Sequence, residues 1–323
     1  MALLVCFDGS EGGNHPLKFR PKSFKADSTI TVDKSGDGNF TSVQAAVDSV
    51  PLNNNAWICI HLKADTYTEK VQITKERQFI YLEGEGRSNT VIRWGDAGDV
   101  TKSSTFSLFA DNFMAAHLTI KNTYDAGNIT WAPAAMLMGD KALFYKCGFV
   151  SIQDTLTDSQ GRHFFDSCYI ESAMDFIWGS GQSVYQGCSI HAVADRLRGG
   201  PGYITAQGRS DSSQTNGFVF KYCNITGNGK SYLGRAYKAY STVIFYKTSM
   251  SNVIVPEGWF SWKQAGQESA ITYAEIECDG PGASMSGRVN WMKKLEDKEL
   301  SHFIGSSFVD GDGWREKMPS PVA

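Results

Sequence analysis

Apolar residues recur along this chain at a nearly constant interval, in short stretches separated by polar turns. Cys147, Cys168 and Cys188 each lie two positions before an apolar residue, and they are 21 and 20 residues apart. The same pairing recurs on both sides, as Leu118/Ile120, Cys147/Phe149, Cys168/Ile170, Cys188/Ile190, Cys223/Ile225 and Thr248/Met250. A short apolar strand that returns about every 20–25 residues is typical of a solenoid, in which each repeat buries its apolar face against its neighbours. The pattern therefore predicts an all-β fold of stacked parallel coils.

Further strands are expected on the N-terminal side of this repeat. They are Ile30–Val32, Ala56–Leu62, Lys70–Ile73, Phe79–Leu82, Val91–Trp94, Phe106–Phe109 and His117–Ile120. Apolar residues between Phe40 and Val50 are spaced three to four positions apart, which predicts a helix that Pro51 ends. An open solenoid end exposes unpaired strand edges, so we expect this helix to cap the first coil.

The repeat also sets the expected boundaries. Residues 1–28 are polar and read as an irregular lead-in, and residues 29–323 form one domain. Cys188 and Cys223 are 35 residues apart, so a loop of about a dozen residues is expected between them, centred on Arg196–Gly202. After Val255 the repeat ends, and a helical segment is expected near Met292–Ile304.

Two aspartates share a position within the repeat. Asp154 lies seven residues after Cys147, and Asp175 lies seven residues after Cys168. Equivalent positions of successive coils stack about 4.8 Å apart, so both side chains should project from one face. Two carboxylates that close do not both ionise easily, which would give one acid and one anionic nucleophile or base at neutral pH. The alternative is two unrelated surface aspartates, and Asp125 and Asp195 fall in a similar register.

Composition excludes several classes of function. With a net charge of −3, the chain has no excess of basic residues with which to bind nucleic acid. The same net charge offers no general attraction for an anionic polymer. Any acidic substrate must therefore be held locally. No apolar run approaches the roughly 18 residues that a membrane span requires. No Gly-x-Gly-x-x-Gly occurs, so we expect no nucleotide cofactor.

The seven cysteines form no Cys-x-x-Cys pair and the six histidines are scattered, so we expect no metal site. Stacked cysteines on adjacent coils would lie within disulfide range, but they would equally form a ladder of reduced thiols. Both readings stay open, and an odd count leaves at least one thiol unpaired. Three Asn-x-Thr triplets, at Asn39, Asn128 and Asn224, permit glycosylation if the chain is secreted.

Four motifs resemble those of plant pectin methylesterases. They are Gln153-Asp154-Thr155-Leu156, Gly161-Arg162-His163-Phe164-Phe165, Asp175-Phe176-Ile177-Trp178-Gly179, and Leu233-Gly234-Arg235-Ala236-Tyr237, which is similar to the family's LGRPW or LGRAW element. The resemblance runs from about Ile30 to Trp314. It implies a right-handed parallel β-helix with an N-terminal capping helix and a C-terminal tail of loops and helix packed along it. Trp259, Trp262, Trp291 and Trp314 are assigned mainly to that packing, with one or two left to line the cleft.

The resemblance also implies an activity, the hydrolysis of methyl esters of homogalacturonan to free carboxylate and methanol in plant cell wall modification. Asp175 would attack the ester carbonyl, and Asp154 would protonate the leaving methanol and then activate water. Gln153 would donate to the oxyanion, and Arg235 would orient Asp175 and keep it ionised. No metal or cofactor is implied.

Substrate-binding residues are expected beside these four. Tyr237 and Trp178 would stack on sugar rings, and Phe176 and Thr105 are further candidates, whereas Phe164 and Phe165 are assigned to the core. Pectin is the implied partner, a proteinaceous methylesterase inhibitor is a second one, and we expect a monomer. The resemblance implies secretion to the cell wall, and some pollen members of the family are allergens. Residues 2–7 are apolar but short, without a basic flank, so no signal peptide is evident.

The chain departs from the family pattern at several points. A second Gln is usual about twenty residues before the Gln-Asp pair, but residues 130–135 read Thr-Trp-Ala-Pro-Ala-Ala. Losing one oxyanion donor commonly costs about 100-fold in turnover. Tyr237 replaces a Trp, and Trp178 replaces a Phe. The inhibitor-like pro-region of many members is not seen, so the chain resembles the short form.

Other activities fit the residues less well. A polygalacturonase or pectate lyase would share the solenoid, but the chain has no Gly-His-Gly and no cluster of calcium-binding carboxylates. A serine esterase would need a motif such as Gly-x-Ser-x-Gly, which is missing. The main rival is a pectin-binding wall protein of the same fold with impaired catalysis. The missing Gln favours it, while Gln153, Asp154, Asp175 and Arg235 weigh against it.

Overall fold

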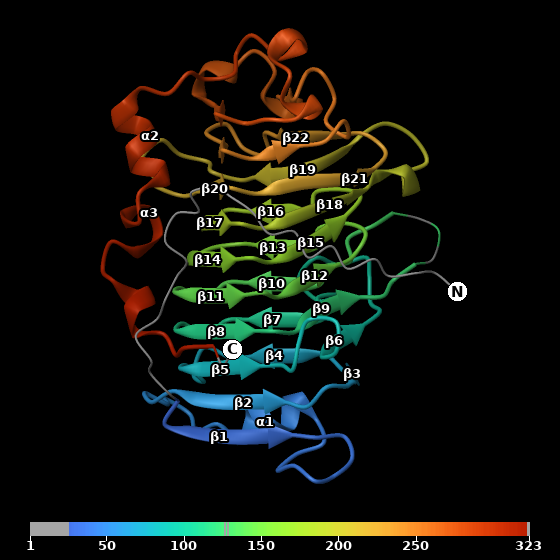
Figure 1. The fold of residues 1–323 in the computed structure, drawn as a ribbon, viewed down its shortest axis with the longest axis vertical. Helices are drawn as coiled ribbons and strands as arrows, with labels where there is room; N and C mark the ends of the chain where they lie inside the picture. The colour runs from blue at the N-terminus through green and yellow to red at the C-terminus, as the bar shows by residue number, and fades with distance from the viewer. Residues whose placement is uncertain (1–25, 126, 128, 322–323) are drawn as a thin grey trace.

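The strands wind into a parallel β-helix of three sheets (Figure 1). The computed structural model describes residues 26–125, 127 and 129–321. A full coil contributes one strand to each sheet, so the repeat seen in the sequence marks one strand in three. The predicted lead-in lies outside the described residues except for its last three, and β1 already begins at Ser28.

The strands of each sheet follow one another along the axis of the helix. The ten-stranded sheet contains β1 (Ser28–Val32), β2 (Ile58–Leu62), β5 (Ile80–Glu83), β8 (Phe113–Ala116), β11 (Ala142–Tyr145), β14 (Arg162–Asp166), β17 (Gln182–Gln186), β20 (Gly217–Lys221), β23 (Thr242–Tyr246) and β26 (Thr272–Ile276). The second sheet contains β4 (Val71–Ile73), β7 (Phe106–Leu108), β10 (Ala135–Leu137), β13 (Leu156–Asp158), β16 (Ile177–Gly179), β19 (Gly202–Gln207), β22 (Ser231–Arg235) and β25 (Trp259–Phe260). The third sheet contains β3 (Thr66–Thr68), β6 (Val91–Trp94), β9 (Thr119–Asn122), β12 (Gly148–Val150), β15 (Tyr169–Ser172), β18 (Ser189–Val193), β21 (Asn224–Asn228) and β24 (Ser249–Met250).

Helices are few and lie at the ends or in the connections. The α-helices are α1 (Val43–Ser49), α2 (Asp297–Ile304) and α3 (Ser307–Asp310). The short 3-10 helices are η1 (Ala194–Arg196), η2 (Trp262–Gln264), η3 (Glu268–Ala270), η4 (Pro281–Ala283), η5 (Met285–Gly287) and η6 (Trp314–Lys317). In the part of the chain that the structure describes, no helix is both long enough and apolar enough to cross a bilayer.

The predicted interior stack is confirmed in the third sheet. Parallel pairing there aligns six buried residues, one from each coil: Ile120, Phe149, Ile170, Ile190, Ile225 and Met250. The ten-stranded sheet carries a second ladder, whose rings stack nearly parallel with centroids 4.4–5.1 Å apart: Phe144, Phe165, Tyr185, Phe220 and Phe245. The assignment of Phe164 and Phe165 to the core is also confirmed.

Several strand boundaries differ from the predicted ones because of backbone conformation. Phe79 and His117 were expected to begin strands, but both have positive φ, 58° and 57°. A residue in the left-handed region cannot continue a ladder, so β5 begins at Ile80 and β9 begins at Thr119. The turns of the coil are therefore sharper than the apolar pattern alone suggests.

The capping helix is confirmed, although α1 is shorter than predicted. Its N-terminus is held by Ser42, whose hydroxyl accepts from the Ala45 N–H, and by Glu69, which accepts from the N–H groups of Val43 and Gln44. A carboxylate at this end also complements the helix dipole. Val43 is one of the residues that α1 buries against the first coils.

The expected long loop is divided into two segments. Residues 194–201 connect β18 to β19, and residues 208–216 connect β19 to β20. The corresponding connections in the preceding coil are only residues 173–176 and 180–181. The prediction of a loop at Arg196–Gly202 is therefore correct in place, but about half of the insertion lies farther along the chain.

Six of the seven cysteines lie in the described residues, and all six are free thiols. Cys147, Cys168, Cys188 and Cys223 are buried, and each thiol donates to the carbonyl of the residue two positions earlier. Burial raises the pKa of Cys147 to about 12. The structure therefore supports the reading of a reduced thiol ladder, and Cys6 lies outside the described residues.

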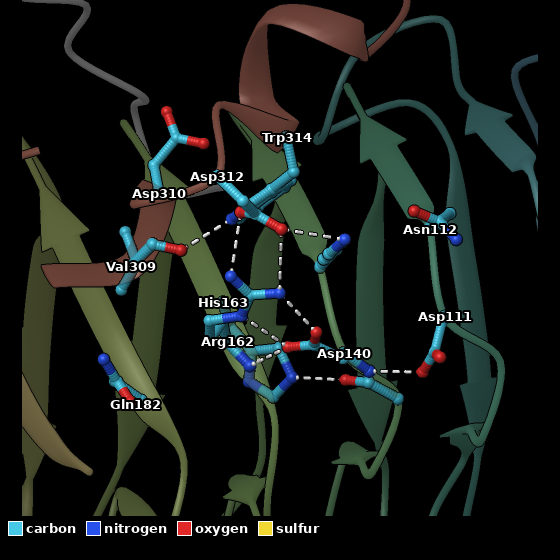
Figure 2. Close-up of polar contacts among 12 residues, drawn as sticks. Asp111, Asn112, Asp140, Arg162, His163, Gln182, Val309, Asp310, Asp312 and Trp314 are labelled. Carbon is cyan, nitrogen blue, oxygen red and sulfur yellow. Dashed lines mark hydrogen bonds and ion pairs between the residues drawn. The ribbon is translucent and has the colours of Figure 1, made fainter. Parts of the chain in front are cut away.

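The predicted C-terminal helix begins five residues later than expected, at Asp297, where Glu296 and Glu299 form a capping box. From there the tail runs along the ten-stranded sheet (Figure 1). Figure 2 shows one attachment, in which Asp312 accepts from Arg162 Nη1 at 2.9 Å. Asp312 also accepts from Lys141 Nζ at 3.0 Å. Trp314 is buried and donates to the Val309 carbonyl at 2.6 Å, which confirms its role in packing.

Two of the three Asn-x-Thr triplets can be placed. Asn39 and Asn224 are exposed, and Asn224 begins β21. Asn128 lies outside the described residues. Both placed side chains are accessible, and glycosylation remains a prediction.

A buried ion pair lies where the second sheet turns into the ten-stranded sheet. His163 is fully buried, with Nδ1 2.6 Å from Asp158 Oδ1 and Nε2 2.8 Å from the Gly139 carbonyl oxygen. Both partners are acceptors, so the ring donates from both nitrogens and is an imidazolium. Burial by itself lowers the pKa of His163, but the charge and hydrogen bond of Asp158 outweigh it and raise the pKa.

This pair predicts a specific pH dependence of stability. Because the folded-state pKa of His163 is raised, its contribution is complete below the ordinary value of about 6.5 and is lost as the pH rises through the folded value. His163→Gln should cost about 3–5 kcal/mol in the free energy of unfolding at pH 6, and less at pH 9. Urea unfolding across this range measures the difference. The exposed His302→Gln variant is the control. If the loss in free energy of unfolding caused by H163Q does not become smaller with rising pH, His163 is not the charged partner of Asp158.

Candidate active site

Asp154 and Asp175 lie on adjacent coils, at the turns that enter β13 and β16. Gln153 bridges to Met174 and Leu156 pairs with Ile177, so the two aspartates occupy equivalent positions. The Asp154 N–H donates to the Met174 carbonyl at 3.1 Å. Both have positive φ, 55° and 47°, a conformation that Asp tolerates better than most residues. Identical backbone geometry on neighbouring coils makes their side chains leave the sheet in the same direction.

The two carboxylates have different partners. Arg235, from β22, donates through Nε to Asp175 Oδ1 at 2.8 Å and through Nη2 to Asp175 Oδ2. The Asp175 side chain is only 3% exposed and that of Arg235 is 17% exposed, so the pair is shielded from water. Burial raises the pKa of Asp175, while the guanidinium charge and its two hydrogen bonds lower it. Burial is the larger effect, so the pKa of Asp175 is raised overall. Of the two carboxylates, Asp175 is nevertheless the one with a cationic hydrogen-bond partner, which favours its anionic form.

Asp154 has no such partner. Burial and then the charge of Asp175 raise the pKa of Asp154 to about 8, against smaller opposing effects of Arg235 and of the Gln153 amide. The proton shared by this carboxylate pair therefore resides on Asp154 at neutral pH. The arrangement supplies one buried acid beside one buried anion, which is the division of roles that a covalent hydrolytic mechanism needs.

A cleft of about 560 Å³ lies next to the two aspartates, lined by the residue that precedes each of them in the chain and by the arginine that pairs with Asp175. Its lining includes Gln153, Met174 and Arg235, together with residues of the loop at 194–201. Gln153 is half-buried at the cleft, next to Asp154, where its amide can donate to an oxygen of a bound molecule.

Aromatic rings surround the guanidinium of Arg235. Trp262 lies over it at 4.1 Å and Tyr203 at 4.8 Å, measured from the guanidinium carbon to the ring centroid. Tyr237 contacts both Trp178 and Trp262, with centroids 5.5 and 5.6 Å apart. Tyr237 and Trp178 are half-buried, so parts of both rings remain accessible beside the site, and their stacking on sugar rings remains a prediction.

Two predicted substrate-binding residues are placed elsewhere. Phe176 follows Asp175 in the turn that enters β16, and its side chain is fully buried in the main hydrophobic core. Thr105 is also fully buried, and its hydroxyl donates to the Lys121 carbonyl at 3.1 Å. Neither side chain can contact a substrate in the cleft, so both expectations are corrected here.

The four aspartates that share a similar spacing in the sequence differ in burial and in stacking. Asp125 and Asp195 are exposed, and Asp125 pairs with Arg196 at 2.7 Å. Only Asp154 and Asp175 of this set are buried and stacked. The reading of two unrelated surface aspartates is therefore excluded.

The register shows what occupies the place of the missing second Gln. Ala135 pairs with Leu156, which places Ala132 on the coil before Gln153, and the Ala132 N–H donates to the Gln153 carbonyl. Ala132 is fully buried in a small apolar cluster with Ile152 and Ala173. A methyl group there donates no hydrogen bond, so Gln153 is the side-chain amide available to an oxyanion from these two coils.

Three residues at the site were not singled out from the sequence. Trp262 was grouped with the packing tryptophans, although one or two were left to the cleft, and Met174 and Tyr203 were not considered. Met174 could have been found, because it directly precedes Asp175 in register with Gln153. Tyr203 stands one coil beyond Asp175, but the longer loop before it hides that register in the sequence.

No set of three or more His, Cys, Asp or Glu side chains within the described ranges is arranged to hold a metal ion.

Comparisons with known proteins agree with this geometry. Residues 29–312 match the family model described as Pectinesterase. Two Arabidopsis thaliana relatives, "Probable pectinesterase 55" and "Probable pectinesterase 29", are 45% and 44% identical over 302 residues, covering 91% of this chain and 92% and 90% of theirs.

Solved structures show the same fold. "Pectin methylesterase from Carrot" matches with a TM-score of 0.85 at 31% identity, over 94% of this chain and 100% of that chain. A pectin methylesterase in complex with "hexasaccharide VII" matches with a TM-score of 0.77 at 25% identity, over 90% of this chain and 98% of that chain. The chain therefore belongs to the pectinesterase family, as a carboxylic ester hydrolase of the plant pectin methylesterase type.

Proposed function

We propose that this protein hydrolyses methyl esters of homogalacturonan through a covalent intermediate on Asp175. The observation that carries the proposal is the unequal environment of two stacked carboxylates: Arg235 holds Asp175 as an anion, while the raised pKa of Asp154 keeps it protonated. This supports a nucleophile and a proton donor one coil apart, next to a cleft that Gln153, Met174 and Arg235 line.

In the first half of the reaction, an Asp175 oxygen attacks the ester carbonyl carbon. The amide of Gln153 donates to the oxyanion that forms. When the tetrahedral intermediate collapses, the bond to the methoxy oxygen breaks and Asp154 transfers its proton to that oxygen, which releases methanol. The products are an acid anhydride between Asp175 and the galacturonoyl group, and an ionised Asp154.

In the second half, water enters where methanol left. Asp154 now takes a proton from the water as its oxygen attacks the galacturonoyl carbonyl, and the bond to Asp175 breaks. Asp175 leaves as a carboxylate, again paired with Arg235, and Asp154 is protonated as at the start. The sum of the two halves is ester plus water giving acid plus methanol.

The setting we propose is the plant cell wall, with pectin as the partner of a secreted monomer and a proteinaceous inhibitor as a further partner. Tyr237, Trp178 and Trp262 form an aromatic cluster next to Arg235, which lines the cleft, and such rings can stack on the sugars of a polymer. The match to a homologue that was solved with a hexasaccharide supports a chain-like ligand.

Removing either carboxylate tests the assignment of roles. Asp175→Asn should lower methanol release from highly methylated pectin by about 10⁴-fold, since the nucleophile is lost. Asp154→Asn should lower it by about 10²–10⁴-fold, because general acid–base catalysis is lost. The matched control is Asp195→Asn, an exposed aspartate of similar spacing that should stay near wild type. Release unchanged in D175N would exclude the proposed nucleophile.

The pH profile gives a second test. Asp154 must carry its proton for methanol to leave, so turnover should fall above about pH 8, where Asp154 ionises. Turnover should also fall at low pH, as Asp175 is protonated. Because burial raises the pKa of Asp175, we expect this fall at a pH above the ordinary carboxyl pKa. Initial rates of methanol release between pH 4 and pH 10 show both limbs. A rate that keeps rising to pH 10 would be inconsistent with Asp154 as the acid.

The role of Arg235 can be separated from catalysis by measuring stability. Arg235→Gln leaves Asp175 buried without its cation, which should cost about 3–5 kcal/mol at pH 7. The unpaired carboxyl then has a folded-state pKa above its unfolded value, so the cost is small below about pH 4 and grows with rising pH. Urea unfolding at pH 4 and pH 7 measures this. The R235Q/D175N double variant should recover most of the free energy of unfolding that R235Q loses. If R235Q is destabilised equally at pH 4 and pH 7, Arg235 does not stabilise the protein by pairing with ionised Asp175.

A further inference from the structure

The loop at residues 194–201 forms one wall of the catalytic cleft. It connects β18 to β19 and contributes Leu197, Arg198 and Gly199 to the lining, opposite Gln153 and Arg235. The equivalent connection one coil earlier, residues 173–176, is four residues shorter, carries Asp175 and contributes only Met174 to the lining. The longer connection therefore adds a structure beside the site that the preceding coil does not have.

Two contacts hold this loop against the body of the β-helix. Leu197 packs on the small apolar cluster that contains Ile152 and Ala173. Arg196 Nη2 donates to Asp125 Oδ1 at 2.7 Å, on the connection between the third sheet and the second in an earlier coil. With the residues before it anchored in this way, Arg198 is kept at the cleft.

The two arginines that line the cleft are not equivalent. Arg235 is paired with Asp175 and covered by Trp262 and Tyr203, so its guanidinium is not available to a carboxylate of the ligand. Arg198 is exposed, and within residues 26–125, 127 and 129–321 it has no carboxylate partner. The cleft thus presents one guanidinium that is free to meet a ligand.

We propose that Arg198 is a specificity-determining residue that binds the free carboxylate of a de-esterified galacturonate unit close to the ester under attack. This inference rests on the proposed function. A methyl ester is neutral and accepts only an ordinary hydrogen bond, whereas a carboxylate can take a bidentate pair from a guanidinium. The net charge of −3 provides no general attraction for such a polymer, so a local cation has a large share in recognising it.

This site links one catalytic event to the next. Each hydrolysis converts a neutral ester into a carboxylate, which is the group that Arg198 recognises. A chain that already carries free carboxylates should therefore bind better than a fully methylated one, and added salt should weaken that advantage because the pair is exposed.

The test compares methanol release from two defined substrates, a fully methylated homogalacturonan oligomer and a partly de-esterified oligomer of the same length. Arg198→Gln should raise KM for the partly de-esterified oligomer by about 5- to 10-fold, with kcat unchanged. KM for the fully methylated oligomer should stay the same. Arg198→Lys should give an intermediate KM for the partly de-esterified oligomer, since Lys keeps the positive charge but cannot form the bidentate pair.

The control is Arg93→Gln, an exposed arginine on β6 of the third sheet with one hydrogen bond to Thr68, for which both KM values should match wild type. If R198Q leaves both KM values unchanged, or raises them equally, the inference is overturned while methanol release by the wild type keeps the proposed function. If the wild type itself releases no methanol from either oligomer, the proposed function fails, and this inference fails with it.

Discussion

In-register parallel pairing between successive coils is the constraint on which the rest of this structure depends. Each coil repeats the backbone of the coil before it at the spacing between paired strands. Residues at equivalent positions therefore stack, and similar side chains on successive coils contact one another. In the interior this produces the stacked rings of Phe144, Phe165 and Tyr185 and the ladder of buried thiols. In the turns that enter the second sheet it stacks Asp154 and Asp175. The same geometry thus builds the core and the site.

Stacking two acids has an electrostatic cost, and the way it is offset determines the chemistry. One bidentate guanidinium cannot serve both carboxylates, and Arg235 is directed to Asp175. Asp154 is left buried and beside a negative charge, which raises its pKa to about 8. Two equivalent positions of the repeat thus acquire different environments through a third residue, from a coil two turns away, and this difference is the basis of the acid and nucleophile roles that we propose.

The parts outside the repeat protect its edges and shape the cleft. Helix α1 covers the first coil, and the C-terminal tail is tied to the ten-stranded sheet through Asp312 and Trp314 (Figure 2). The loops at 194–201 and 208–216 are tolerated because they leave the strands in register on both sides. One of them places Arg198 at the cleft, where the coil would otherwise have a short turn.

The sequence by itself determined the fold class and the interior stack, because these follow from a spacing of about twenty residues that can be counted. The spacing alone left four aspartates in similar register, and the motifs selected Asp154 and Asp175 among them. The sequence also pointed to Gln153 and Arg235, through motifs. It did not determine which residues face the cleft: Phe176 and Thr105 are buried, while Trp262, Tyr203 and Arg198 lie at the site. That outcome depends on turns with positive φ and on loops that vary in length, and both change the register by amounts that only the folded chain reveals.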